Sequence, residues 1–378
     1  MTVRGLLGLA VVLLMGCGAE PPPVTDLQQT LGGEADPGFR RAVTPRAFEF
    51  PADHGAHPEY QTEWWYFTGH LALAGDAGAS AASRRFGYQL TFFRQALKPD
   101  SPAANPGGWS TGQLYLAHFA VSDLDGGRFF HDQRLSRGAA GLAAAATDRL
   151  SVDLDDWSAH WRDDGIMLRA TGDAVALELN LTPVSPVIPH GDNGLSIKGA
   201  GPGNASYYYS IPELASSGTL MLAGERLPVR GSSWLDREWS TSVLSKNQTG
   251  WDWFSLQLGG GRYLMLFQLR DAEGRADGYA AGSLVDGEQR LQLTAEDFVL
   301  SPGGYWRSPH SDARYPLRWR LEIPGQQLAL TVEAMLDDQE LNQTFRYWEG
   351  AVRATGRWGT EELSANGYLE MTGYDRAQ

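Results

Sequence analysis

The chain has 378 residues, of which 42% are hydrophobic, 11% aromatic and 20% charged. This balance predicts a folded protein rather than a disordered one, with enough residues for two domains. The formal net charge of −14 repels phosphate backbones and argues against nucleic acid as a partner. A single cysteine excludes an intramolecular disulfide and a cysteine-based zinc cluster. No sequence pattern requires a metal ion or a cofactor.

Residues 1–16 have the features of a signal peptide, with Arg4 before an apolar run that is short for a membrane span. The run ends in Leu14-Met15-Gly16-Cys17, which resembles a bacterial lipobox. The resemblance implies cleavage before Cys17 and a lipid on its sulfur. The alternative is an ordinary secretory signal with an incidental cysteine. Gly18 follows the cysteine, and by the same resemblance this implies an outer-membrane lipoprotein on the periplasmic face of the cell envelope.

The segment 17–45 contains Pro21-Pro22-Pro23 and little apolar periodicity, so we expect a flexible tether after the lipidated cysteine. From Phe48 onward, short apolar or alternating runs are separated by Gly and Asp turns, which predicts meandering antiparallel strands. The expected strands are Glu63–Leu73, Phe86–Phe93, Gln113–Leu124, Val175–Leu181, Trp251–Leu258, Tyr263–Leu269, Arg318–Ile323 and Gln327–Ala334.

An all-β fold follows, and closed barrels are the usual way for such strands to hide their edges and to enclose a ligand. The best local helix former, Ala139–Ala146, has no amphipathic stripe. We expect an N-terminal domain over 46–240 and a C-terminal domain over 241–376. Prolines and glycines gather from Pro212 to Pro228, which suggests a domain boundary within about 215–245.

Familiar catalytic motifs are absent or out of context. A Gly-x-Ser-x-Gly match surrounds Ser110, but a strand follows it where a nucleophile elbow needs a helix, so a turn is the better interpretation. His54 and His57 could bind a metal together with a distant carboxylate. Polar loop residues before a strand are the more frequent explanation of such a pair.

The segment from Glu63 to Thr68 alternates so that Glu63, Trp65 and Phe67 share one face of a strand, with Trp64 and Tyr66 on the other. If the first face is interior, burial would raise the pKa of Glu63 and make it a candidate acid. The alternative is a structural strand whose glutamate pairs with an arginine.

A second segment, Trp234-Leu235-Asp236-Arg237-Glu238-Trp239, precedes Trp251 and Trp253 and interleaves aromatic with acidic residues. In a strand, Trp234, Asp236 and Glu238 share one face. Aromatic rings can stabilise a cation, and an adjacent carboxylic acid could protonate an alkene. Asp236 or Glu238 would then be the acid. The alternative, an Asp–Arg pair with tryptophan packing at the domain junction, fits the spacing about equally well.

Four segments, taken in order, resemble the family of AttH and the carotenoid 1,2-hydratases (the CrtC-like family). They are Glu63–Leu71, Ser206–Pro212, Trp234–Ser240 and Tyr347–Tyr374. The resemblance implies two lipocalin-like β-barrels packed together. It also implies functions that range from cofactor-free water addition to an isoprenoid double bond, through assistance of cyclisation, to lipoproteins of unknown role. Trp234 stands where the hydratases carry a tyrosine, and Arg237 stands where many relatives carry a histidine.

Two functions follow. The first is a membrane-anchored module that binds a hydrophobic ligand of isoprenoid or polyene type, with a membrane transporter as candidate partner. The second is a cofactor-independent hydratase or isomerase with Asp236, Glu238 and Glu63 as candidate acids. The ligand wall would consist of Trp65, Tyr66, Trp234, Trp239, Trp251 and Trp253. The sequence favours binding slightly.

Geometry separates the two functions. An enzyme should point Asp236 or Glu238 into a cavity, with a raised pKa and no salt bridge. A carrier should pair these carboxylates with arginines such as Arg237 or Arg262 beside an apolar cavity. Hydrolysis, the third possibility, has only the Ser110 match in its favour.

Overall fold

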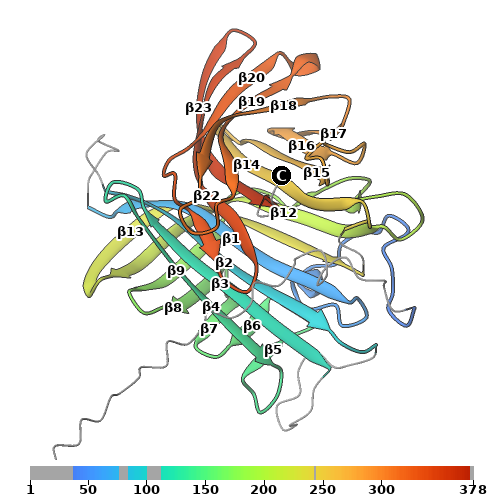
Figure 1. Ribbon diagram of the computed structural model, residues 1–378. Helices are drawn as coiled ribbons and strands as arrows, with labels where there is room; N and C mark the ends of the chain where they lie inside the picture. Colours follow the sequence, from blue (N-terminus) through green and yellow to red (C-terminus); the bar gives the residue numbers. More distant parts are fainter. Residues whose placement is uncertain (1–36, 76–83, 100–111, 242–243, 375–378) are drawn as a thin grey trace, which may run out of the picture.

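The computed structural model describes residues 37–75, 84–99, 112–241 and 244–374. Within them the chain is almost entirely β, with two strongly curled antiparallel sheets that form barrel-like halves (Figure 1). The predicted all-β fold with two barrel-like units is confirmed. Two short 3-10 turns, η1 (Ala52–His54) and η2 (Pro324–Gln326), are the helical elements of the described residues.

The N-terminal half is a 13-stranded sheet in the described residues, with β10 and β11 paired to β12 beside the main path. Along that path the order is β4 (Arg128–Arg137), β3 (Gln113–Asp123), β2 (Arg85–Ala96), β1 (Thr62–Leu73), β13 (Glu225–Ser240), β12 (Ala205–Leu222), β9 (Val175–Pro183), β8 (Gly165–Thr171), β7 (Trp157–Arg162), β6 (Ser151–Leu154) and β5 (Ala143–Ala145). The side strands are β10 (Ile188–Pro189) and β11 (Leu195–Ile197).

The C-terminal half is a 10-stranded sheet in the same part of the chain, with β21 (Glu340–Asn342) paired to β22 off the main path. The path runs β17 (Gln289–Thr294), β16 (Ala281–Asp286), β15 (Arg262–Asp271), β14 (Gln248–Gly259), β23 (Glu361–Thr372), β22 (Arg346–Trp358), β20 (Leu328–Ala334), β19 (Arg314–Ile323) and β18 (Val299–Arg307).

Each of the eight expected strands coincides with an observed strand to within a few residues, because alternating burial and Gly or Asp turns are local signals. The segment Ala139–Ala146, the best local helix former, instead contains strand β5. It pairs with β6 and buries Ala143 and Ala145 in the core, so tertiary packing overrides helix propensity.

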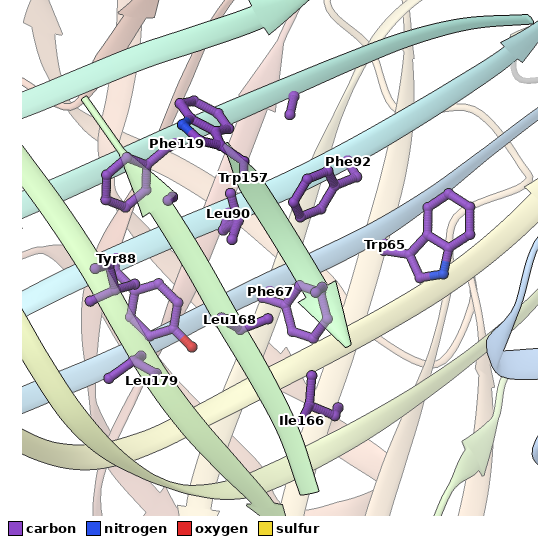
Figure 2. Close-up of a cluster of buried hydrophobic side chains, with 14 of the residues drawn as sticks. Trp65, Phe67, Tyr88, Leu90, Phe92, Phe119, Trp157, Ile166, Leu168 and Leu179 are labelled. Carbon is purple, nitrogen blue, oxygen red and sulfur yellow. The ribbon is translucent and has the colours of Figure 1, made fainter. Parts of the chain in front are cut away.

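The interior of the N-terminal sheet is filled rather than hollow. Figure 2 shows large side chains such as Trp65, Phe67, Phe92 and Trp157 converging inside this sheet. A separate cluster around Trp319 fills the C-terminal sheet. The expectation that a barrel interior holds the ligand is therefore wrong for these cores, since aromatic and aliphatic side chains occupy that space. A third cluster, which includes Tyr66, lies where the two sheets meet.

The Pro/Gly-rich stretch from Pro212 to Pro228 belongs to the hairpin between β12 and β13, not to a boundary between sheets. Its turn residues Ala223 and Gly224 both have positive φ, the conformation of a tight two-residue hairpin turn. The chain passes from the first sheet to the second between Ser240 and Gln248.

The last residues of the predicted tether, about 38–45, pack on the folded body. Phe39 and Ala42 are buried, Arg40 N–H donates to the carbonyl of Glu59, and the hydroxyl of Tyr207 donates to the carbonyl of Thr44. Residues from about 38 onward therefore pack on the folded body. Cys17 and the signal segment lie outside the described residues. No helix among the described residues is long and apolar enough to cross a membrane.

Candidate functional site

A cavity of about 90 Å³ lies between the two sheets, against their outer faces. Strands β1, β2, β12 and β13 form one wall, and β14, β15, β22 and β23 form the other. The lining residues are mainly aromatic or acidic: Trp64, Tyr66, Phe93, Lys198, Tyr208, Asp236, Glu238, Ser240, Leu244, Trp251, Trp253, Phe267, Leu269, Tyr347, Glu349 and Glu370. An adjoining, more apolar hollow of about 150 Å³ shares Phe93, Trp251, Tyr347 and Glu370 with it.

Two acidic residues of strand β13 line this cavity. Asp236 and Glu238 line the cavity, whereas Leu235 belongs to the N-terminal core and Arg237 is fully buried with partners on that side. The two-residue period of a strand separates the sets. The predicted shared face of Asp236 and Glu238 is therefore observed.

Asp236 accepts hydrogen bonds from neutral groups only, among the partners that the described residues provide. The Tyr208 hydroxyl donates to Oδ2 and the Trp234 indole N–H donates to Oδ1, each at a distance of 2.5 Å. The Ser210 hydroxyl also donates to Oδ1. Asp236 is 3% exposed. Burial raises the pKa of Asp236 to about 7, and the nearby charge of Glu238 adds to the rise, although the three donors oppose it. Within the described chain, Asp236 forms no salt bridge.

Trp234 supplies one of the hydrogen-bond donors of Asp236. Its indole N–H contacts the Asp236 carboxylate. Its ring packs in the cluster between the sheets rather than in the cavity lining.

Glu238 lies beside the cation of the cavity, Lys198. The ammonium Nζ is 3.3 Å from Oε1 of Glu238 and 3.6 Å from the centroid of the Phe267 ring. The Ser206 hydroxyl also donates to Glu238. Burial lowers the pKa of Lys198, while Glu238 opposes this shift. Glu238 therefore has an ion-pair partner, whereas Asp236 has none among the described residues.

Glu63 does not reach this cavity. It lies on the opposite face of β1, between the fully buried guanidinium groups of Arg94 and Arg237, whose N–H groups donate to Oε1 and Oε2 respectively. Burial alone would raise the pKa of Glu63, but the two arginines outweigh it and hold that pKa well below its usual range. The alternative given for this segment, a structural strand whose glutamate pairs with an arginine, is therefore what the structure shows, and the conditional rise in the pKa of Glu63 does not occur.

The predicted aromatic wall divides into two groups. Tyr66, Trp251 and Trp253 line the cavity. Trp234 packs between the sheets and is not among the lining residues, which corrects its assignment to the ligand wall. Trp65 packs in the N-terminal core, and Trp239 stacks on His57 with ring centroids 3.8 Å apart. The assignment of these last two to the ligand wall is corrected, because alternation turns both away from the cavity.

Two glutamates that the sequence analysis did not propose complete the acidic lining. Glu349 of β22 and Glu370 of β23 stand directly opposite each other in the strand register. Each interrupts an otherwise apolar or aromatic strand, Tyr347–Val352 and Tyr368–Met371. A charged residue inside such a run is the signal that would have found them, because charged residues are rarely buried without a purpose.

A chain of hydrogen bonds extends from Asp236 away from the cavity. Ser210 contacts Asp236, and its Oγ is 2.6 Å from Nε2 of His190. Nδ1 of His190 is 2.9 Å from the hydroxyl of Ser283, which donates to Gln292. Burial lowers the pKa of His190 well below its usual range, so the imidazole is neutral near pH 7.

The two histidines considered as metal ligands have other partners. His54 contacts the Tyr209 hydroxyl, and His57 lies between Asp53 and Glu63. Within the described residues, no group of three or more His, Cys, Asp or Glu side chains is arranged to hold a metal ion. Ser110 lies outside the described residues.

A family model described as AttH-like matches residues 41–374. The chain belongs to the AttH-like family. A crystal structure described as AttH from Nitrosomonas europaea is 36% identical, covers 89% of this chain and 100% of its own, and superimposes with a TM-score of 0.78. The fold of kievitone hydratase from Nectria haematococca is also similar, with a TM-score of 0.63 at 14% identity and coverage of 89% and 98% of the two chains.

Two curated relatives have hydratase or dehydratase names. A dehydratase, asqC, from Emericella nidulans is 23% identical in an alignment of 219 residues; the match covers 53% of this chain and 54% of that protein. Kievitone hydratase from Fusarium solani subsp. phaseoli is 22% identical in an alignment of 209 residues; the match covers 53% of this chain and 58% of that protein. The chain spans about half the length of the curated relatives it matches.

Proposed function

We propose that this AttH-like protein adds water to, or eliminates water from, a hydrophobic substrate without a cofactor, with Asp236 as the general acid. The observation that carries the proposal is the setting of Asp236: it faces an aromatic cavity, has neutral hydrogen-bond partners among the described residues, and has a pKa raised to about 7. A carboxyl group that stays partly protonated near neutral pH can donate a proton. The names of the two curated relatives support the same reaction class.

The cavity walls suit the charge that such a reaction develops. Protonation of a double bond leaves a carbocation, and loss of a protonated hydroxyl group creates the same charge. Trp64, Trp251 and Trp253 line the same cavity as Asp236, and aromatic rings can stabilise a cation. Burial removes competing bulk water and strengthens these interactions.

The acid is tested with kievitone and a panel of acyclic isoprenoid alkenes as probes, incubated in ¹⁸O-labelled water and followed by mass spectrometry. The corresponding tertiary alcohols test the reverse direction. We expect the wild type to incorporate labelled oxygen and Asp236→Asn to lose about 100-fold or more in kcat, since general acids contribute 10²–10⁴-fold.

Asp123→Asn is the matched control, because this buried carboxylate pairs with Arg84 and Arg128 away from the cavity. It should keep wild-type kcat. Equal activity of wild type and Asp236→Asn would refute the role of Asp236. A probe that both proteins bind and leave unchanged would instead support a carrier.

We also propose that the mature protein is a lipoprotein at the periplasmic face of the outer membrane, anchored through Cys17 and receiving its ligand there, with a membrane transporter as candidate partner. The lipobox-like sequence before Cys17 supports this. The mass of the N-terminal peptide from membrane-purified protein tests it: a diacylglyceryl-modified Cys17 is expected, and an unmodified cysteine would refute the anchor.

A further inference from the structure

The C-terminal wall of the cavity carries the paired glutamates Glu349 and Glu370, which the role of Asp236 leaves unexplained. They face each other across neighbouring strands, where side chains of like charge destabilise a sheet. Among the described residues neither forms a salt bridge. Glu349 is 1% exposed and Glu370 is half-buried. A pair that costs stability and lines a cavity indicates a chemical role.

One carboxylate oxygen of this pair lacks a hydrogen-bond partner among the described residues. Tyr66 donates to Oε1 of Glu349 over 2.5 Å. Oε2 of Glu349 is buried and has no hydrogen-bond partner in the described part of the chain. A buried oxygen without a partner carries a large desolvation cost, which a water molecule or a substrate hydroxyl in the cavity would remove.

Tyr66 also sets the position of the pair relative to the acid. It stands opposite Asp236 in the pairing of β1 with β13, and its hydroxyl reaches across to Glu349 on the other sheet. The acid and the paired glutamates therefore flank one cavity from two sheets. The cavity therefore has a carboxyl group of one sheet on one side and the two carboxyl groups of the other sheet on the opposite side.

We propose that Glu349 and Glu370 form the base of the site: an ionised carboxylate of the pair binds the reacting water and takes its proton, while Asp236 protonates the double bond. This rests on the proposed hydratase function and adds its second proton-transfer group. In hydration, a C–H bond forms with the Asp236 proton as the π bond breaks. A C–O bond then forms between water and the cationic carbon, and the water proton moves to the pair.

The balance is one water added to the substrate and one proton moved from Asp236 to the glutamate pair. Return of that proton through solvent restores the enzyme, and dehydration uses the same steps in reverse. Burial raises the pKa of Glu370 to about 8, and burial together with the charge of Glu370 raises that of Glu349 well above its usual range. A carboxylate of raised pKa is a stronger base than an ordinary glutamate, which suits abstraction of a proton from water.

The test compares Glu349→Gln and Glu370→Gln with wild type on the probe that wild type converts, across the pH range. Each variant should lose about 100-fold in kcat with little change in KM. The wild-type rate should rise with pH as the pair ionises and fall as Asp236 ionises. The rising limb should disappear in the glutamine variants, and the falling limb should disappear in Asp236→Asn.

Glu340→Gln is the matched control, because this buried glutamate of the same sheet is hydrogen-bonded by Ser308 and Tyr315 away from the cavity lining. It should retain both limbs. Glu349→Asp keeps a carboxylate and should recover part of the lost rate, which separates loss of the base from loss of folding.

The outcomes distinguish the two proposals. A wild type that converts no probe overturns the hydratase function and this inference with it. An active wild type together with glutamine variants that keep kcat, or that keep the rising limb, overturns the base alone. Loss of the rising limb with recovery in Glu349→Asp supports it.

Discussion

Glu63 and Asp236 are both buried acids of the same pair of strands, yet their surroundings give them opposite properties. Glu63 points to the N-terminal side of β1 and is held by two arginines, which keep the pKa of its carboxyl low. Asp236 points into the cavity from β13 and has neutral donors, and burial raises the pKa of its carboxyl to about 7. Burial alone does not decide the charge of an acid. The charge of its partners does.

The largest expected effect is the loss of stability when one of the two arginine partners of Glu63 is removed. Arg94 donates to Glu63, to Gln113 and to the carbonyls of His57 and Tyr60. Arg94→Met leaves a buried carboxylate with one arginine, so we expect a loss of about 3–5 kcal/mol in the free energy of unfolding, measured by denaturant titration.

Arg85→Met, which breaks a pair with Asp125 in which both side chains are more than a third exposed, should have a far smaller effect. Similar losses in the free energy of unfolding for Arg94→Met and Arg85→Met would show that the buried pair of Arg94 with Glu63 stabilises the fold no more than an exposed pair does.

An intermediate effect concerns the dependence of stability on pH. Unfolded aspartate has a pKa of about 3.9, so between that pH and about 7 folded Asp236 keeps a proton that the unfolded chain has lost. The unfolded state binds fewer protons, and the contribution of Asp236 to the free energy of unfolding therefore falls as pH rises. The free energy of unfolding of the wild type minus that of Asp236→Asn should fall by about 2 kcal/mol between about pH 5 and 6.5.

Glu63 should behave in the opposite way. The pKa of its carboxyl is lower in the folded protein than in the unfolded chain. Its stabilising contribution is therefore present above the unfolded value of about 4.3 and is lost as pH falls toward the folded value. If the free energies of unfolding of wild type and Asp236→Asn differ by the same amount at every pH from about 5 to 6.5, the contrast between the two acids is refuted.

The smallest expected effect concerns the neutral hydrogen-bond donors of Asp236. Trp234→Phe keeps a ring between the sheets but removes the N–H that donates to Asp236. Because that donor stabilises the ionised form, the pKa of Asp236 should rise by about one unit or less. Carbon-13 NMR of labelled aspartate carboxyls measures it, with Trp358→Phe, whose half-buried ring lies in the C-terminal sheet, as the control. A fall in the pKa would contradict the hydrogen-bond account.

Local pattern predicted the strands and the cavity face of β13, because alternation is written into consecutive residues. It put Asp236 and Glu238 on one face and identified Trp251 and Trp253. Alternation alone separates Trp239 from Asp236 and Glu238, and Trp65 from Tyr66. It could not say which face of β1 meets the cavity, because this depends on how the two sheets pack.

The sequence pattern also could not predict contacts between residues distant in the chain, because these depend on how the strands pair. Arg94 stands opposite Glu63 in the pairing of β1 with β2, and Glu349 stands opposite Glu370 in the pairing of β22 with β23. Each glutamate was visible as an isolated charge in an apolar strand. Their pairing was not, since it requires the three-dimensional arrangement.

The contact from Tyr66 on one sheet to Glu349 on the other has a thermodynamic consequence. A ligand that occupies the cavity binds only when both sheets hold their relative placement, so its binding free energy is added to the association of the two halves. By linkage, each tenfold excess of ligand over its dissociation constant stabilises that arrangement by about 1.4 kcal/mol. Thermal unfolding of the two halves should therefore become more cooperative as the cavity fills.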